Sequence, residues 1–327
     1  MSEYKKHYLI TGGAGFIGSH LVKALLNDTS IRITIIDNFD PFYPRQIKLL
    51  NTDGFEKHQQ IILLDRSLDD LTPNELGKIL TQKVDVIIHL AAKAGVRPSI
   101  NDPLAYQRTN ILGTQMLLDF ARESEVKQFV FASSSSVYGV NKNLPWKEDE
   151  QLQPISPYAM TKLAGEMAGH VFSNLYGIRF IALRFFTVYG PSQRPDLAIH
   201  KFVKSVLSGQ PITMYGDGST SRDYTYVEDI VKGVLSAINY DRSMFEIINL
   251  GNSYSVSLQD LVNKVQEVVG KKASIDHQKE QAGDVPQTFA DITKAKHLLN
   301  YQPTTQLTDG LKSFYDWFLK NRETLLH

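Results

Sequence analysis

The chain has 327 residues, of which 42% are hydrophobic and 21% are charged, as in an ordinary globular protein. Its 35 lysines and arginines balance 35 acidic residues, so no basic excess favours binding to nucleic acid or to an anionic membrane. The sequence has no cysteine, which excludes disulfides, thiolate metal sites and a cysteine nucleophile. The polar N-terminal stretch contains no signal peptide, and no apolar run is long enough to span a bilayer. We therefore expect a cytoplasmic protein without a metal site.

Strands alternate with helices through the first half of the chain. The expected strands are Tyr8–Thr11, Ile31–Asp37, Gln60–Leu64, Val84–Leu90, Gln128–Ser133 and Phe180–Arg184. The expected helices are Phe16–Leu26, Asn74–Leu80, Pro103–Glu123 and Pro157–Tyr176. Strands such as Val84–Leu90 are apolar at nearly every position, as is typical when helices cover both faces of a parallel sheet. This alternation predicts an α/β fold with a doubly wound parallel sheet, the Rossmann arrangement.

The pattern changes after Gly190, where loops lengthen and strands become sparse. Further helices are expected over Ile199–Leu207, Val227–Ile238, Leu258–Val269 and Leu307–Leu319. We interpret residues 1–190 as one domain and residues 191–327 as mainly a smaller, interleaved C-terminal α/β domain over the carboxyl edge of the sheet. Segment 222–250 is expected to return to the main sheet.

A glycine-rich turn joins the first strand to the first helix. Gly12, Gly15 and Gly18 follow the spacing G-x-x-G-x-x-G, a variant of the dinucleotide-binding fingerprint. The first glycine allows the tight turn, the second lets the backbone approach a pyrophosphate, and the third permits close helix–strand packing. Backbone N–H groups at the helix start would receive the phosphate charge. Glycines also mark ordinary turns, but the strand–loop–helix context favours a dinucleotide site.

Acidic residues end the second and third strands. Asp37 lies 19 residues after Gly18, where a carboxylate can accept hydrogen bonds from the adenine ribose and would repel a 2′-phosphate. This favours NAD over NADP. Asp65 either faces the adenine edge or belongs to a turn, and the sequence leaves both interpretations open.

Tyr158 and Lys162 lie four residues apart at the start of an expected helix and therefore share one face. A phenol titrates near about 10, and a nearby ammonium or an oxidised nicotinamide would favour the phenolate. Such a pair is also common on exposed helices, so it carries weight only behind the glycine fingerprint and the strands. The run Ser133–Ser136 ends the preceding strand at the edge where doubly wound folds bind ligands.

Together these motifs resemble the extended short-chain dehydrogenase/reductase family and, within it, the nucleotide-sugar epimerases. The resemblance covers nearly the whole chain. It includes Gly12–Gly18, His89–Ala92, Asn110, Ala132–Gly139, Ser156–Lys162, Leu183–Pro191, Tyr215–Gly218, Ser221–Tyr224 and Gly283–Asp284.

The resemblance implies a mechanism around a retained NAD. Tyr158 would take the proton of the sugar 4-hydroxyl while the nicotinamide takes hydride from C4. Lys162 would hold the nicotinamide ribose and lower the pKa of Tyr158, and Ser134 would hydrogen-bond the reacting oxygen. The 4-keto sugar would then rotate and receive the hydride on its other face. The implied cofactor-binding residues are Gly12, Gly15, Phe16, Ile17, Gly18, Asp37, Asn38, Asp65, Leu90, Ala91, Ala92, Asn110, Tyr158 and Lys162.

A few positions distinguish the subfamilies. Dehydratases of this family carry Asp-Glu before Val-Tyr-Gly and uronate decarboxylases carry a Glu, whereas this chain has Ser135 and Ser136. Elimination needs a second proton donor, so the serines favour simple epimerisation. Thr187 and Gln281 replace the Asn and Arg that UDP-galactose epimerases usually have, and both departures resemble UDP-glucuronate 4-epimerases.

The same resemblance implies a substrate site in residues 191–327 and the neighbouring loops. Its residues would be Arg97, Ser134, Ser136, Thr187, Arg194, Tyr215, Arg222 and Asp284. Arg194 would bind the sugar carboxylate or rigidify its loop, and Arg97 would do the same or contact a phosphate. Either arginine could instead be a solvated loop charge. Arg222 would contact a phosphate, and Tyr215 would stack on uracil.

The leading prediction is C4 epimerisation of UDP-glucuronate to UDP-galacturonate, and the alternative is a UDP-glucose/UDP-galactose 4-epimerase. A dehydrogenase that releases NADH would need cofactor exchange. An inert NADP-sensing regulator would lose Tyr158 or Lys162, which are both present. A homodimer is expected, because family members commonly pair the helices that correspond to Pro103–Glu123 and Pro157–Tyr176. The apolar stripes of these helices could equally be buried within one chain.

Overall fold

A seven-stranded parallel sheet forms the centre of the molecule. The computed structural model describes residues 4–279, 283 and 285–326, and the strand order in the sheet is β10–β6–β5–β4–β1–β2–β3. Its strands are β1 (Lys6–Thr11), β2 (Ile31–Asp37), β3 (Ile61–Asp65), β4 (Val86–His89), β5 (Gln128–Ser134), β6 (Arg179–Phe185) and β10 (Phe245–Leu250). Each neighbouring pair is parallel. The predicted doubly wound fold is confirmed.

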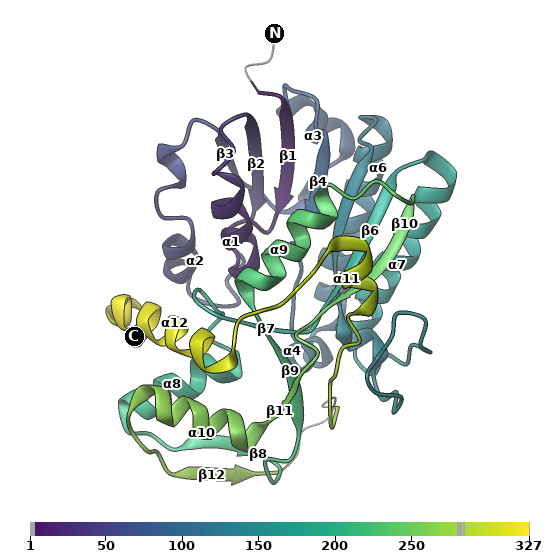
Figure 1. Ribbon diagram of the computed structural model, residues 1–327. Helices are drawn as coiled ribbons and strands as arrows, with labels where there is room; N and C mark the ends of the chain where they lie inside the picture. Colours follow the sequence, from purple (N-terminus) through teal and green to yellow (C-terminus); the bar gives the residue numbers. More distant parts are fainter. Residues whose placement is uncertain (1–3, 280–282, 284, 327) are drawn as a thin grey trace.

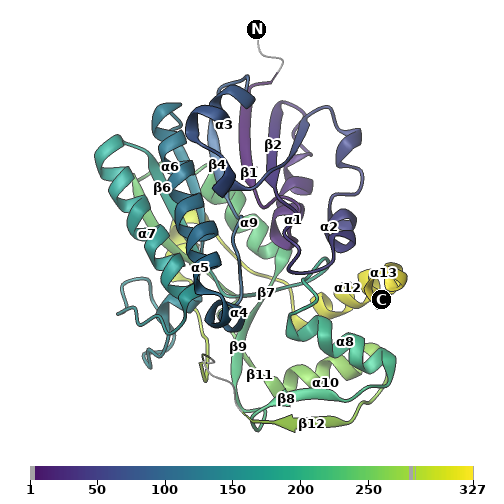
Figure 2. The same cartoon turned by 180° about the vertical axis from the view of Figure 1, so that it is seen from behind.

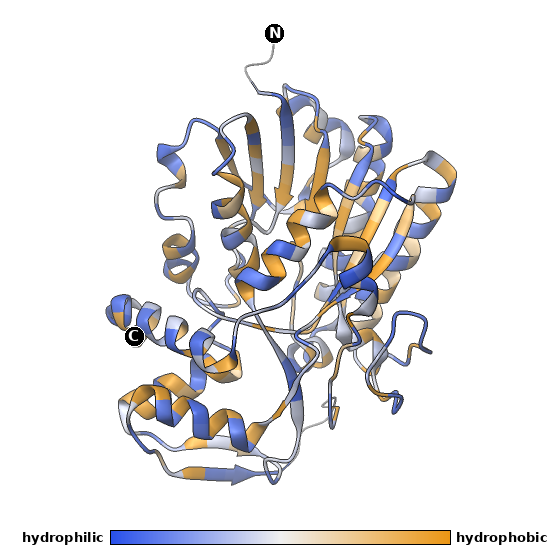
Figure 3. Cartoon of the chain, viewed as in Figure 1, coloured by the Kyte–Doolittle hydropathy of each residue, from blue (hydrophilic) through white to orange (hydrophobic). Residues whose placement is uncertain are grey.

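Helices cover both faces of this sheet. On the face seen in Figure 1 lie α1 (Phe16–Leu25), α9 (Val227–Ile238) and α11 (Thr293–Leu299). Figure 2 shows α3 (Pro73–Ile79), α6 (Gly113–Glu123) and α7 (Pro157–Tyr176) on the opposite face. Successive strand residues bury themselves in the two opposite cores, as Leu9 and Ile10 do. Figure 3 shows the resulting concentration of hydrophobic residues along the central strands.

Shorter elements make the other connections of the central sheet, most of them at its carboxyl edge, with η1 at the amino edge before β3. They are α2 (Arg45–Asn51), η1 (Phe55–Lys57), η2 (Leu68–Asp70), α4 (Val96–Asn101), α5 (Pro103–Tyr106), η3 (Gln107–Leu112) and η4 (Ser135–Tyr138). The predicted single helix Pro103–Glu123 is thus three consecutive pieces, because the π-helical segment η3 interrupts it. π-Helical insertions of this kind often accompany functional sites.

The second half contains more strands than its sequence pattern indicates. Its further elements are β7 (Thr187–Tyr189), α8 (Ala198–Ser208), β8 (Ile212–Tyr215), β9 (Ser221–Tyr226), β11 (Ser255–Ser257), α10 (Leu258–Val269), β12 (Ile275–Gln278), α12 (Leu307–Lys320) and α13 (Arg322–Leu326). The expectation of sparse strands after Gly190 was wrong, since strands of three to six residues are too short to show a clear alternation.

These elements pair into small sheets beyond the carboxyl ends of the central strands (Figure 1). β7, β9 and β11 form one sheet, and β8 and β12 form another. β9 leads into α9 and then into β10, which pairs with β6. The division at residue 190 into two domains stays a prediction.

Helix α7 lies directly on β5 and β6. It begins at Ser156, whose side chain accepts a hydrogen bond from the Ala159 N–H. Further along, a Cβ placed on Gly165 would lie 2.4 Å from the Phe131 ring, and one on Gly169 would lie 2.2 Å from the Phe180 ring. This close approach brings the first turn of α7 to the carboxyl end of β5. No helix in the described ranges is long and apolar enough to cross a membrane.

Candidate active site

A pocket of about 590 Å³ opens at the carboxyl ends of the central strands. Many of the residues predicted for the cofactor and for catalysis line it together. They are Gly12, Gly15, Phe16, Ile17, Gly18, Asp37, Asn38, Leu90, Ala91, Ala92, Ser134, Ser136, Tyr158, Lys162, Thr187 and Arg194. The position agrees with the rule that open α/β sheets bind ligands outside the carboxyl ends of their strands.

The glycine turn packs closely on itself and on the loop after β4, with no side chain between its backbone and the pocket. Gly12 has φ 75°, and a Cβ there would lie 2.7 Å from the backbone nitrogen of Ala91. A Cβ on Gly18 would lie 2.1 Å from the Gly12 carbonyl oxygen, so side chains at these positions are excluded. Gly15 precedes the first turn of α1 and has no side-chain cap. These features fit the pyrophosphate of a dinucleotide.

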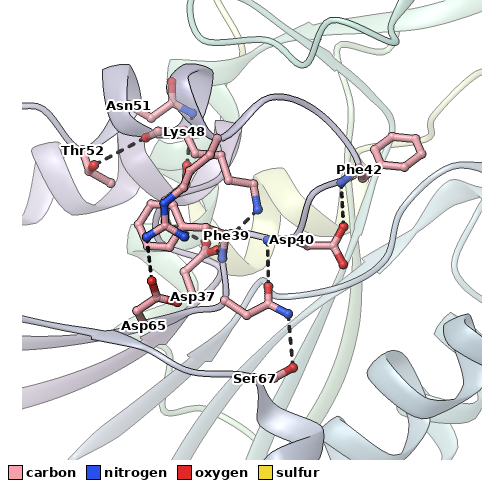
Figure 4. A network of polar contacts seen from close by, with 12 residues as sticks. Asp37, Phe39, Asp40, Phe42, Lys48, Asn51, Thr52, Asp65 and Ser67 are labelled. Carbon is pink, nitrogen blue, oxygen red and sulfur yellow. Dashed lines mark hydrogen bonds and ion pairs between the residues drawn. The ribbon is translucent and has the colours of Figure 1, made fainter.

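Asp37 ends β2 inside the pocket, and Figure 4 shows the polar network around it. Its carboxylate accepts hydrogen bonds from the N–H groups of Ala14, at 3.0 Å, and Phe39, at 2.9 Å. The Lys48 ammonium lies 3.5 Å from Oδ1, and both side chains are buried. Lys48 was not predicted as a site residue, because the segment after β2 reads as a loop in the sequence.

Two predicted cofactor residues make contacts of another kind. Asp65 pairs with Arg45 at 2.6 Å and is half exposed, whereas Ser67 nearby lines the pocket. Asn110 is buried in η3, where it bonds both backbone groups of Lys93 and the Thr161 hydroxyl. Neither Asp65 nor Asn110 is among the residues that line the pocket. Their direct roles at a cofactor stay predictions.

Ser134, Tyr158 and Lys162 come together at the end of β5. All three line the first pocket, and the Ser134 hydroxyl lies 3.1 Å from the Ser136 hydroxyl. The buried Lys162 ammonium donates to the Ala132 carbonyl at 2.7 Å. It lies 6.0 Å from the centre of the Tyr158 ring.

The surroundings change the charge state of this group. Burial lowers the pKa of Lys162 to about 7, against the opposing charge of Glu166. Burial also raises the pKa of Tyr158, although the hydrogen bond with Ser134 and the charge of Arg194 act in the opposite direction. The lowering of the Tyr158 pKa by Lys162 and an oxidised nicotinamide stays a prediction. Burial outweighs the stabilisation of the phenolate in the protein alone.

A buried ion pair behind this group was missed in the sequence. Glu166 accepts two hydrogen bonds from Arg184, at 2.9 and 2.8 Å, and a third from Ser133 at 2.5 Å. Arg184 also donates to the Tyr138 hydroxyl at 2.9 Å. An arginine inside an apolar strand and a glutamate one turn after Lys162 were the signals that could have revealed it, since buried charges need partners.

A second pocket, of about 880 Å³, adjoins the first and shares Thr187 and Leu197 with it. It contains the predicted residues Arg97, Tyr215 and Arg222. The Arg97 guanidinium lies 4.6 Å from the centre of the Tyr215 ring, and Arg222 donates to the Ser221 carbonyl at 2.8 Å. Lys201 and Lys204 also line this pocket and were not predicted. The predicted residues Asp284 and Gln281 lie outside the described residues.

Arg194 reaches the first pocket from the loop before α8. Its guanidinium makes two hydrogen bonds to Asp196, at 2.9 and 2.6 Å, and one to the Ala94 carbonyl at 3.3 Å. These contacts agree with the alternative in which Arg194 rigidifies its own loop. Its role as a partner of a sugar carboxylate stays a prediction.

Over the ranges that the structure describes, no group of three or more His, Cys, Asp or Glu residues could hold a metal ion.

The fold, the glycine turn and the Ser134–Tyr158–Lys162 group define a dinucleotide-dependent enzyme of the extended short-chain dehydrogenase/reductase class. Residues 9–314 match the GDP-mannose 4,6 dehydratase family. The chain belongs to this family, which confirms the resemblance.

Relatives with assigned names are similar over nearly their whole length. The chain is 42% identical to an uncharacterized UDP-glucose epimerase of Bacillus subtilis over 93% of this chain and 95% of that protein. It is 36% identical to the UDP-glucuronate 4-epimerase of Thermodesulfobacterium geofontis over 98% of each. The crystal structure of UDP-glucuronic acid 4-epimerase from Bacillus cereus, in complex with UDP-glucuronic acid and NAD, has a TM-score of 0.90 and 37% identity. The match covers 96% of this chain and 99% of that one.

Proposed function

We propose that this chain is an NAD-dependent 4-epimerase that interconverts UDP-glucuronate and UDP-galacturonate. The observation that carries the proposal is the meeting of Ser134, Tyr158 and Lys162 in one pocket with the glycine turn. Ser135 and Ser136 stand beside them where dehydratases carry acids. The relatives named UDP-glucuronate 4-epimerase support the same reaction.

The residues of the pocket fit NAD, and different residues would bind its different groups. The backbone at Gly12 and Gly15 would hold the pyrophosphate, Asp37 the adenine ribose, and Lys162 the nicotinamide ribose. Bound NAD supplies the acceptor for the hydride from C4. Its positive charge near Tyr158 would also offset the burial that raises the Tyr158 pKa.

The chain's own residues would move the proton and orient the sugar. Tyr158 would accept the proton of the 4-hydroxyl and later return it, and Ser134 would hold the reacting oxygen by a hydrogen bond. Thr187 lies where the two pockets meet, so we place the sugar there. Tyr215 would then stack on uracil and Arg222 would contact a phosphate in the second pocket.

The preference for a uronate is the finer part of the proposal. Arg194 lines the same pocket as Tyr158, and its charge acts to lower the pKa of Tyr158, so we place the substituent at C5 near its guanidinium. To bind a carboxylate it would exchange or share its contacts with Asp196. The relative named as a UDP-glucose epimerase supports the alternative substrate.

NMR of the anomeric signals would test the proposal directly. UDP-glucuronate and UDP-glucose are incubated separately with the protein, and we expect UDP-galacturonate to form faster than UDP-galactose. Formation of UDP-galactose alone would show that UDP-glucose, and not UDP-glucuronate, is the substrate.

A Tyr158→Phe variant should lose turnover by at least about a hundredfold while it still binds NAD and UDP. Full activity of this variant would refute the mechanism.

We further propose a homodimer formed through η3, α6 and α7, and a location in the cytoplasm. The apolar residues Leu112, Met167, Val171 and Leu175 are about half exposed or more on these elements, at 59%, 64%, 48% and 62%. Exposed apolar patches of this kind often mark protein interfaces. A cysteine-free sequence agrees with a reducing compartment.

A further inference from the structure

An ion pair crosses the cofactor pocket between two loops. The Lys93 ammonium lies 2.9 Å from Oδ2 of Asp40, and each side chain is less than one third exposed. Both residues line the 590 Å³ pocket. Asp40 follows β2 and Lys93 follows β4.

The place of this pair in the sheet makes it a bridge over β1. In the strand order, β1 lies between β4 and β2, and neighbouring strands are about 4.8 Å apart. The loops that the pair joins therefore start about 10 Å apart, one on each side of the glycine turn. Asp37 ends β2 on one side of β1, whereas Tyr158 and Lys162 lie on α7, which packs on β5 and β6 on the other side. All three residues line the pocket.

Each partner is held in place by its own loop. The backbone of Lys93 is fixed at its N–H, 2.8 Å, and its carbonyl, 3.0 Å, by the buried Asn110. Asp40 is fixed by two short turns: its N–H donates to Asn38, and its Oδ1 accepts from the Phe42 N–H at 2.9 Å. Figure 4 shows the Asp40 turn beside the Asp37 network. Little conformational entropy is therefore lost when the pair forms.

The charge of Asp40 also agrees with a formed pair. Burial alone would raise the pKa of this carboxyl, but the hydrogen bond from Lys93 and the backbone N–H of Phe42 hold its pKa below the usual value. The carboxylate is thus ionised at neutral pH and attracts the ammonium throughout the physiological range.

We propose that the Asp40–Lys93 pair closes over the middle of a bound dinucleotide and slows its dissociation between turnovers. The inference rests on the proposed function, because it takes the pocket to be the NAD site. An enzyme that returns the hydride in each cycle gains from a cofactor that does not leave. The two loops would have to separate before the pyrophosphate could pass between them.

The test measures exchange of bound NAD in the full chain, not turnover. The protein is loaded with radiolabelled NAD, and the loss of label is followed after addition of excess unlabelled NAD. The Lys93→Met and Asp40→Asn variants should each lose label about three- to tenfold faster than the unchanged protein, the range expected for a partly exposed pair. In Asp40→Asn, the side-chain oxygen still accepts from the Phe42 N–H, so the amide nitrogen faces Lys93 and cannot replace the ion pair.

A double variant and a matched control make the result specific. If the pair acts as one bridge, Lys93→Met combined with Asp40→Asn should exchange no faster than either single variant. Lys294→Met removes an ion pair of 2.7 Å with Glu246 that is exposed to a comparable degree, and neither of these residues lines the pocket. This control should exchange at the rate of the unchanged protein.

Three outcomes would overturn the bridge. They are unchanged exchange in both single variants, faster exchange in Lys93→Met alone, and additive effects in the double variant. The second would mean that Lys93 binds the cofactor directly without Asp40. An unchanged protein that contains no NAD after purification and also takes up none would instead refute the proposed function, so the two failures are distinguishable.

Discussion

Lys162 is a cation in an almost fully buried position, at 3% exposure. Its nearest compensating charge is Glu166, one helical turn further along α7. Two other titratable groups lie nearby, Arg184 and His89, and neither supplies a negative charge. Arg184 neutralises much of Glu166, and burial lowers the pKa of His89 to about 3, so that imidazole is neutral. The charge of Lys162 near neutral pH therefore depends on Glu166.

Replacing Glu166 by Gln should move the pH dependence of turnover. Glu166 raises the pKa of Lys162, and burial has lowered it to about 7. Removing the carboxylate lowers this pKa further and leaves the Arg184 charge uncompensated. Activity that needs charged Lys162 is lost as pH rises through its pKa, so the loss should begin about one pH unit lower. The measurement is kcat against pH in both proteins.

The control is Glu148→Gln, which changes a partly buried glutamate whose side chain accepts from the Asn249 N–H. In this variant, kcat should fall over the same alkaline pH range as in the unchanged protein. The same pH range in Glu166→Gln would show that the ion pair is structural only. A parallel thermal unfolding scan separates loss of folding from the shift in pH dependence.

How far the site could be predicted depends on the kind of residue. Tyr158, Lys162 and the glycines have spacings fixed by helix and turn geometry, which the sequence shows directly. Asp65 contacts Arg45 and Asn110 contacts Lys93, and only the tertiary fold brings these partners close. No local pattern records such contacts.

At the scale of elements, the packing of α7 on the sheet sets the position of Tyr158 and Lys162. Gly169 lies against Phe180, which is fully buried and stacks on Phe129 at 5.2 Å between ring centres. The Phe180 ring has little space to move. A side chain at residue 169 must therefore push the helix away from the sheet.

Gly169→Ala should destabilise the protein by about 1–3 kcal/mol, since overpacking outweighs the gain in helix propensity. The matched control is Gly77→Ala in α3, where nothing lies within 4 Å of the added Cβ. The control should be neutral or more stable by up to about 1 kcal/mol. Thermal and urea unfolding compare the two. Equal effects would contradict the packing argument.

The central strands and long helices of the first half were predictable because the strands are continuous apolar runs and the helices have a helical period. The π-helical η3 was not, since its side-chain pattern continues that of the neighbouring helices and only the backbone hydrogen bonds change. The strands β8, β11 and β12 have three or four residues each. Whether such a short segment forms a strand depends on its pairing with distant segments, which the local sequence does not show.

At the scale of the whole molecule, one face of the sheet is covered by helices that still expose apolar side chains. On α7, Met167, Val171 and Leu175 are spaced by four residues and so share one face. The other face of α7 packs on the sheet through Gly165 and Gly169. The helix therefore has an inner contact within the chain and an outer surface that a second copy could cover.

Placing charges on that outer surface should produce a monomer. In Met167→Asp with Leu175→Asp, a dimer would have to bury two carboxylates in each copy, which costs far more than the surface contacts contribute. Sedimentation velocity should show a dimer for the unchanged protein and a monomer for the variant. Leu49→Asp on α2 places a charge at another exposed apolar residue, 49% exposed, and should leave the dimer intact. Because the inner contacts of α7 are unchanged, the monomer should still bind NAD. An unchanged protein that sediments as a monomer would refute the dimer.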